Sequence, residues 1–138
     1  MSRIHSQDYF EKRILFDGLE YLLNNSLLVP VSDVDGILDA HGKGWLVFEV
    51  KYGDSPVPTG QKIMLERLVK GLLKTKPVFC LICQHQGGEN IYLKDCKVSF
   101  FYCGKGWQEL KSRPTVKMFV DWFLSVHASE MLPHNNRA

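Results

Sequence analysis

The sequence predicts an α/β fold in which helices flank one mixed sheet, within a single domain over residues 1–138. Segments with apolar residues at helical spacing alternate with short apolar runs bounded by turn residues. Glycines separate two of these runs in the way that is typical of a β-hairpin. With 45% hydrophobic and 23% charged residues, the chain has the composition of a globular domain.

The N-terminal half predicts a helix, a strand and a hairpin, in that order. An apolar stripe at helical spacing runs from about Gln7 to Asn24, which predicts a helix. The apolar run 27–31 predicts a strand. The segment 34–52 predicts a hairpin whose arms are 35–39 and 45–51, joined by a turn rich in glycine.

The C-terminal half continues with a helix, three strands and a final helix. The elements expected in order are a proline-containing loop at 54–58, a helix from an N-cap at Thr59 to about Lys74, strands at 78–84, 90–93 and 97–102, a turn at 104–106, and a helix from Pro114 or Thr115 with Val116, Phe119, Val120 and Phe123 on its apolar face. The predicted core is therefore αβββαβ over roughly 7–84, followed by extra strands and a helix over 90–127 and a frayed tail at 132–138.

Bulk features exclude some classes of protein. Residues 1–13 contain no apolar segment of the kind found in secretory signals, and no apolar run approaches the roughly 20 residues that span a bilayer. We therefore expect an intracellular, cytoplasmic protein with no membrane partner. The formal net charge of +2 is near balance, so any nucleic-acid binding must depend on a local basic surface.

Four cysteines allow two disulfides or a zinc site, and a zinc-stabilised binding protein is one hypothesis. Cys80 and Cys83 have the spacing of half a zinc knuckle. However, both lie in a run that predicts a buried strand, where residues three apart point to opposite faces. The sequence therefore favours small buried thiols.

Candidate catalytic residues lie on the predicted hairpin. Along its second arm, Leu46, Phe48 and Val50 alternate with Val47, Glu49 and Lys51, so a period of two places Glu49 and Lys51 on one face. Asp35 on the first arm reaches that face only if the loop has an odd length, because directly opposed residues share a face. A three-residue loop at 42–44 would place Asp35 opposite Lys51, whereas a two-residue loop would place it opposite Val50.

These residue types suit the hydrolysis of a phosphodiester. Negative charge develops on the phosphate and on the leaving oxygen, and Mg²⁺ or Mn²⁺ held by oxygen ligands screens it. Asp35 and Glu49 are the candidate ligands, helped by the carbonyl of Val50. Lys51 is the candidate that orients or deprotonates the attacking water, or stabilises the charged phosphate.

The Asp35-Gly-Ile-Leu segment followed by Glu49-Val-Lys51 resembles the signature of the PD-(D/E)XK nucleases. The resemblance covers roughly residues 7–84 and implies a restriction-endonuclease-like core with a catalytic hairpin. The family includes Holliday-junction resolvases, phage exonucleases and virus-type replication-repair nucleases. In the last group a helix opening with Gln follows the strand, and Gln61 matches that position. In resolvase-like members a Glu on the first helix joins the metal site, which Glu11 resembles.

The resemblance implies a metal-dependent deoxyribonuclease that acts on DNA as an endonuclease or exonuclease, and it is compatible with a homodimer. Basic side chains that could follow the DNA backbone are Lys43, Lys62, Arg67, Lys70 and Lys74. Trp107 follows a predicted turn and could stack on a base. The alternative hypothesis is a nuclease fold without catalysis that binds nucleic acid or protein.

Overall fold

The structure, a computed structural model, describes residues 21–23, 27–29 and 32–129, and the chain forms two compact units, 1–33 and 34–138. In the first unit, strand β1 (Tyr21–Leu23) pairs antiparallel with β2 (Leu27–Val29). The strand predicted at 27–31 is confirmed for 27–29. The helix predicted over 7–24 is wrong for 21–23, because their backbone groups pair with β2, and its other residues lie outside the described part.

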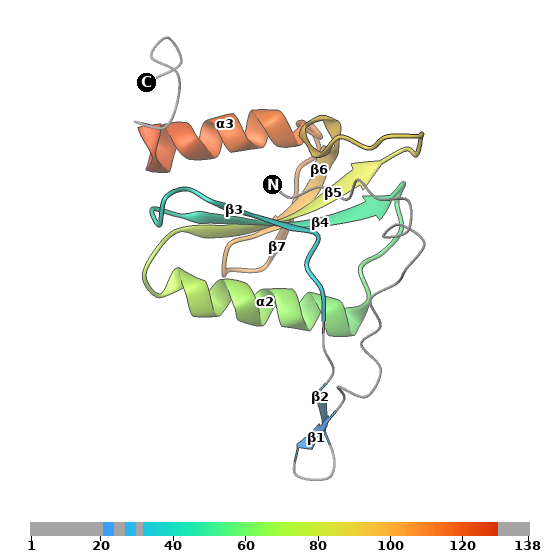
Figure 1. The fold of residues 1–138 in the computed structure, drawn as a ribbon, viewed down its shortest axis with the longest axis vertical. Coiled ribbons are helices and arrows are strands. Elements are labelled where there is room, and N and C mark those ends of the chain that lie inside the picture. Colours follow the sequence, from blue (N-terminus) through green and yellow to red (C-terminus); the bar gives the residue numbers. More distant parts are fainter. Residues whose placement is uncertain (1–20, 24–26, 30–31, 130–138) are drawn as a thin grey trace, which may run out of the picture. The chain divides into compact units, whose positions relative to one another are not determined.

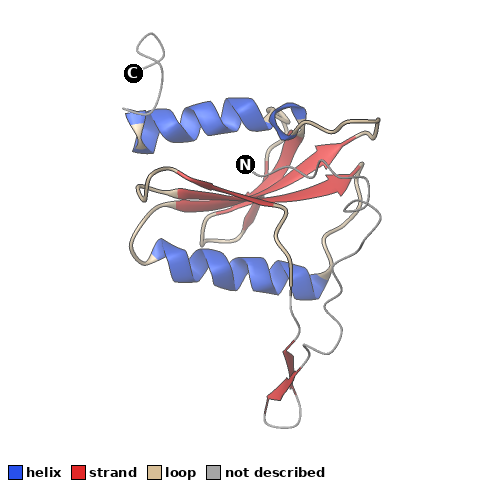
Figure 2. Cartoon of the chain, viewed as in Figure 1, coloured by secondary structure: helices blue, strands red, loops and turns tan. Residues whose placement is uncertain are grey.

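The second unit is built on a five-stranded mixed sheet with the strand order β3-β4-β5-β6-β7 (Figures 1 and 2). The elements of this unit are β3 (Gly36–Asp39), β4 (Trp45–Tyr52), α2 (Thr59–Leu73), β5 (Val78–His85), the short 3₁₀ helix η1 (Leu93–Asp95), β6 (Lys97–Tyr102), β7 (Trp107–Glu109) and α3 (Val116–His127). Strands β4 and β5 are parallel and are connected through α2, whereas every other pairing is antiparallel. The predicted α/β class and mixed sheet are therefore confirmed.

The two helices cover opposite faces of this sheet (Figure 1). On one face, Phe119 and Phe123 of α3 pack with residues of β4, β5 and β6 that include Leu46 and Leu81. On the other face, α2 packs through its buried side chains against Val47 of β4 and its neighbours on β5. Because both faces are covered, β4 is buried on both sides, and not only on the side predicted from its alternating pattern.

The loop that joins β3 to β4 has an odd length, as predicted, but spans five residues, 40–44, and not three. Asp39 pairs with Trp45, so the ladder is displaced by two residues from the expected register and each side chain keeps its predicted face. His41 and Gly42 adopt positive φ angles, and the Gly42 N–H donates to Asp39 Oδ1 at 2.7 Å. The loop closes through the Ala40 N–H, which donates to the Gly44 carbonyl at 3.0 Å.

Gly44 fixes this loop against α3, and a matched pair of glycine substitutions tests the contact. A Cβ at position 44 would lie 2.7 Å from Phe123 Cζ and 3.1 Å from the Pro77 carbonyl oxygen. We expect Gly44→Ala to lower the free energy of unfolding by about 1–3 kcal/mol through overpacking. Gly71→Ala in α2, where nothing lies within 4 Å, should raise it by roughly 0.5–1 kcal/mol. Urea denaturation measures both, and equal effects would contradict the contact.

Two further expectations about local structure are wrong. Thr59 is the first residue of α2 and not its N-cap: Pro58 holds that position, and its carbonyl accepts the Lys62 N–H at 2.9 Å. The strand expected at 90–93 is absent from the described structure. Hydrogen bonds from Asp95 N to the Tyr92 carbonyl and from Cys96 N to the Leu93 carbonyl close η1, so this backbone turns on itself where a strand would pair with a neighbour.

The remaining predicted elements agree with the structure, whereas strand β7 was not predicted. The strands at 78–84 and 97–102, the loop at 54–58 and the turn at 104–106 are confirmed. Thr115 caps α3, since its side chain accepts the Met118 N–H at 3.2 Å. Among the described residues, no helix is both long and apolar enough to cross a membrane.

Three of the four cysteines, Cys80, Cys83 and Cys96, are buried free thiols, and Cys103 is half-buried. Cys80 packs in the cluster under α2 and Cys83 in the cluster under α3, so the prediction that they occupy opposite faces is confirmed. Burial raises the pKa of Cys80 to about 12 and also raises the pKa values of Cys83 and Cys96. A raised pKa disfavours the thiolate that metal binding and nucleophilic attack require.

Candidate active site

Three of the predicted site residues meet on the face of the sheet that α2 covers. Glu49 and Lys51 project from β4, and Gln61 projects from the first turn of α2. Lys51 Nζ lies 3.1 Å from Glu49 Oε2 and donates to Gln61 Oε1 at 3.2 Å. Gln61 Nε2 donates to the same Glu49 Oε2 at 2.8 Å. We call these three residues the Glu49 cluster.

The local sequence explains why the cluster forms. The two-residue period of β4 puts Glu49 and Lys51 on the same face as Val47, which packs under α2. Leu65 and Val69 bury the sheet-facing stripe of α2, and Gln61 begins that stripe one turn earlier. Packing of the apolar stripe therefore carries the Gln61 amide to the two charged side chains.

Glu49 is unusual among charged residues because it is only 3% exposed. Its Oε2 atom accepts from Lys51 and Gln61, but its Oε1 atom is buried and has no hydrogen-bond partner among the described residues. An unpartnered carboxylate oxygen inside a protein carries its full desolvation cost. The contacts within the protein therefore satisfy only one of the two carboxylate oxygens of Glu49, and the other is left for a ligand.

Burial raises the pKa of Glu49 above its ordinary value, and the negative charge of Asp35 raises it further. The hydrogen bond and positive charge of Lys51, together with the hydrogen bond from Gln61, act in the opposite direction. The effect of Asp35 means that the two predicted metal ligands interact electrostatically. A positive charge between them would relieve both the burial cost and this repulsion.

Asp35 lies immediately before β3 and reaches the partner strand through its side chain. Its Oδ2 atom accepts the Val50 N–H at 2.7 Å. This bond extends the β3–β4 pairing beyond Gly36, the first residue of the ladder, and fixes the carboxylate beside Glu49. The proposed role of the Val50 carbonyl as a metal ligand stays a prediction.

The donor set fits a hard divalent cation. Glu49 Oε1 is an anionic oxygen without a partner among the described residues, and Asp35 supplies a second, exposed carboxylate. Oxygen ligands of this kind are those that Mg²⁺ and Mn²⁺ prefer. Among the described residues no group of three or more His, Cys, Asp and Glu side chains surrounds a single point. The other ligands would be carbonyl groups, water or the substrate itself, which is usual for Mg²⁺.

The predicted basic residues occupy three different places. Lys62 lies beside the cluster, with its ammonium 5.6 Å from the centre of the Trp107 ring. Arg67 and Lys70 are exposed on α2, Lys74 is exposed at its C-cap, and none of the three joins the cluster. Lys43 lies in the loop before β4, at the opposite end of that strand from Lys51, and Glu11 lies outside the described residues.

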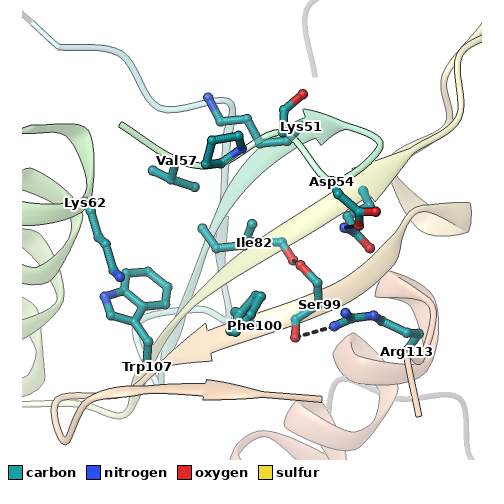
Figure 3. Close-up of a pocket in the computed structure, with 12 residues that line it drawn as sticks. Lys51, Asp54, Val57, Lys62, Ile82, Ser99, Phe100, Trp107 and Arg113 are labelled. Atoms are coloured by element: carbon teal, nitrogen blue, oxygen red, sulfur yellow. Dashed lines mark hydrogen bonds between the residues drawn. The ribbon is translucent and has the colours of Figure 1, made fainter. Parts of the chain in front are cut away.

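A cavity of about 370 Å³ opens next to Lys51, and sequence reasoning missed most of it (Figure 3). Its walls come from β5, β6 and β7 and from the loop between β4 and α2. Of its lining residues, only Lys51, Lys62 and Trp107 stood out in the sequence. No sequence pattern pointed to Phe100 or Arg113, because the pairing of β5, β6 and β7 brings them to the cavity from segments that lie apart in the sequence.

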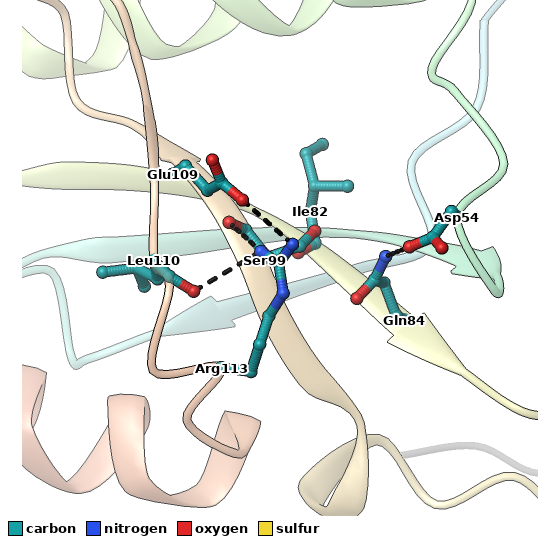
Figure 4. A network of polar contacts seen from close by, with 7 residues as sticks. All are labelled: Asp54, Ile82, Gln84, Ser99, Glu109, Leu110 and Arg113. Atoms are coloured by element: carbon teal, nitrogen blue, oxygen red, sulfur yellow. Dashed lines mark hydrogen bonds and ion pairs between the residues drawn. The ribbon is translucent and has the colours of Figure 1, made fainter.

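Polar contacts fix the walls of this cavity (Figure 4). Arg113 donates to the Ser99 carbonyl at 2.8 Å and pairs with Glu109 at 3.1 Å, which ties the turn after β7 to β6. On the opposite wall, Gln84 Nε2 donates to Asp54 Oδ1 at 2.8 Å. The loop after β4 is thereby attached to the end of β5.

Comparison of the chain with protein-family models, with curated proteins and with solved structures finds no match. Inference about function therefore depends on the geometry of Asp35 and the Glu49 cluster.

Proposed function

We propose that this protein is a divalent-metal-dependent deoxyribonuclease of the PD-(D/E)XK type, with a restriction-endonuclease-like core. The observation that carries the proposal is the state of Glu49. It is a buried carboxylate with one partnerless oxygen, held by Lys51 and Gln61 and placed beside Asp35. Most buried polar atoms in folded proteins have a hydrogen-bond partner, so the Oε1 atom of Glu49 is a candidate position for a ligand.

The arrangement of elements supports the same proposal. Strands β3 and β4 form a hairpin that carries the two acids, and α2 leads from β4 to the parallel strand β5. This is the order that the sequence resemblance implies for the catalytic core. Gln61 opens the helix after the Glu49-Val-Lys51 strand, and its amide contacts both charged residues.

Each residue of the site has a distinct chemical task in this proposal. Asp35 and Glu49 would hold Mg²⁺ or Mn²⁺, which when bound screens the charge that develops on the scissile phosphate. The Lys51 ammonium has three donors, of which two meet Glu49 and Gln61, so one remains for a water or a phosphate oxygen. Gln61 is a positioning residue, because its amide orients Lys51 and Glu49 and would act on the substrate only through them.

The test is cleavage of labelled linear duplex, single-stranded and four-way-junction DNA in Mg²⁺, Mn²⁺ or EDTA. Wild-type protein is compared with two variants, Lys51→Ala and Lys76→Ala. Lys76 is an exposed lysine just before β5 begins, at the end of the sheet opposite Lys51. We expect metal-dependent cleavage that Lys51→Ala abolishes and Lys76→Ala retains. Cleavage that persists in EDTA, or that survives in Lys51→Ala, would refute the assignment.

Gln61 provides a second, graded test. Removing a partner that orients metal ligands typically costs about 10–100-fold in metal affinity or activity. We expect Gln61→Ala to slow cleavage by about this factor and to raise the metal concentration needed for half-maximal rate. Gln86→Ala, in the exposed loop after β5, is the control and should leave both quantities unchanged. An unchanged metal requirement in Gln61→Ala would mean that Gln61 does not position the site.

The second candidate is a nuclease fold without catalysis that binds nucleic acid. The cavity beside Lys51 favours it, since its basic and aromatic side chains suit binding whether or not chemistry follows. The same DNA panel separates the two candidates: binding without metal-dependent cleavage by the wild-type protein would favour the binding module.

A further inference from the structure

The cavity beside Lys51 combines aromatic and basic side chains next to the proposed catalytic cluster. Helix α2 packs over β4 and β5 (Figure 1). The cavity is lined by residues of β5, β6 and β7, among others (Figure 3). Lys51 and Ile82 lie toward one side of the opening and Phe100 and Trp107 toward the other. Its volume of about 370 Å³ is within the range of sites that bind small molecules. We call it the β6–β7 pocket.

Two aromatic rings with adjacent cations distinguish this pocket from an ordinary apolar groove. Phe100 is 38% exposed although it lies on a central strand, and the Arg113 guanidinium lies 5.8 Å from its ring centre. The Trp107 ring is fixed by two contacts, one with Tyr102 and one from its Nε1 to Glu66 at 2.7 Å. Rings held in place in this way offer stacking surfaces at little entropic cost.

The charges around the pocket are positive on balance. Lys51, Lys62 and Arg113 line it, and Asp54 is the acidic residue among its lining groups. Asp54 accepts a hydrogen bond from Gln84, and Arg113 is paired with Glu109. Lys51 is paired with Glu49, whereas Lys62 has no ion-pair partner among the described residues and its ammonium lies over the Trp107 ring.

We infer that the β6–β7 pocket binds an unpaired nucleotide of the DNA substrate, next to the phosphate that is cleaved. The base would stack on Phe100 beside Trp107, and the adjacent phosphates would meet the ammonium groups of Lys51 and Lys62, which both line the pocket. Base–aromatic stacking combined with a basic groove is how proteins bind single strands without sequence preference. A base within a continuous duplex is stacked and paired, and entry to the pocket would require its extrusion at a cost of a few kcal/mol.

This inference rests on the proposed function for its position, because Lys51 belongs to both the Glu49 cluster and the pocket. It extends that function by naming the substrate class: DNA with single-stranded character, such as a free single strand, a frayed end or a flap.

The experiment measures binding of a fluorescent oligothymidylate of about ten nucleotides and of a blunt duplex to metal-free protein. Wild type is compared with Phe100→Leu, Phe100→Tyr and Lys62→Glu, and with Lys76→Glu as the charge-matched control. Phe100→Leu keeps an apolar side chain and removes the stacking ring, whereas Phe100→Tyr keeps the ring. We expect about tenfold weaker single-strand binding in Phe100→Leu and Lys62→Glu, wild-type binding in Phe100→Tyr, and a change under about twofold in Lys76→Glu.

The inference would be overturned if wild type, Phe100→Leu and Lys62→Glu bound the single strand with equal affinity. It would also be overturned if the two variants lost as much affinity for the duplex as for the single strand. The pocket assignment and the nuclease proposal can fail independently of each other. If the wild-type protein cleaves DNA but the pocket variants bind and cleave single strands normally, the pocket assignment fails and the nuclease stands. If the wild-type protein cleaves nothing while Phe100→Leu specifically loses single-strand binding, the pocket assignment stands and the nuclease fails.

Discussion

Glu49→Gln is expected to reduce metal-dependent cleavage by at least about a hundredfold while leaving the metal-free protein as stable as wild type or more stable. Removal of groups that merely orient metal ligands costs about 10–100-fold, so loss of a ligand should cost at least the upper end of that range. Stability should not fall, because burial and the neighbouring Asp35 charge disfavour the ionised carboxylate, as the raised pKa of Glu49 indicates. Active-site residues often exchange stability for function in this way.

Two measurements check this expectation together. Cleavage is measured in Mg²⁺ and Mn²⁺, and thermal unfolding is measured in EDTA and with added Mn²⁺. Bound metal raises the unfolding temperature only if the folded protein has a site, so the wild type should gain stability from Mn²⁺ and Glu49→Gln should not. Glu89→Gln, an exposed carboxylate in the loop after β5, serves as the control and should behave as wild type. Lower stability of Glu49→Gln in EDTA would indicate a structural ion pair and count against the proposed site.

Phe123→Ala is expected to have the largest effect on stability among single substitutions in α3. Phe123 is fully buried, its ring lies 5.9 Å from that of Phe79 and 4.8 Å from that of His127, and it touches Gly44. Removing a buried Phe side chain typically costs about 3–5 kcal/mol, through lost burial and the cavity left behind. This is a large part of the roughly 5–15 kcal/mol that stabilises a domain.

Urea denaturation followed by tryptophan fluorescence measures the loss. Met118→Ala is the matched control, because Met118 lies on the same helix and is 60% exposed. Its effect should stay within about 0.5 kcal/mol, as for most surface substitutions. A loss below about 1 kcal/mol for Phe123→Ala would mean that α3 is not anchored to the sheet through this residue.

The site could be predicted from the sequence to the extent that it depends on local periodicity. Alternation along β4 placed Glu49 and Lys51 on one face, and the requirement for an odd loop placed Asp35 on that face too. The length of that loop could not be predicted, since the contact of Gly44 with Phe123 joins segments far apart in the sequence. The strand at 21–23 was missed because an apolar tripeptide at the end of a helical pattern fits either structure.

The burial of the site residues was harder to predict from the sequence than the faces on which they lie. The alternation along β4 predicted the face on which Glu49 lies but not its burial, because α2 covers that face and leaves Glu49 only 3% exposed. The pocket was missed for a related reason. Phe100 lies opposite Ile82 because β6 pairs with β5 with an irregularity in register at Ile82/Cys83. No sequence pattern within either strand predicts that pairing.

The two parts of the proposed site come from separate stretches of the chain. The Glu49 cluster is supplied by residues 49–61 alone, within one strand–helix connection, whereas the far wall of the pocket comes from residues 97–113. Mutations in β6, β7 and the turn after them can therefore alter the pocket without moving the cluster. In evolutionary terms, such a division would let related proteins exchange one substrate for another while inheriting the same chemistry.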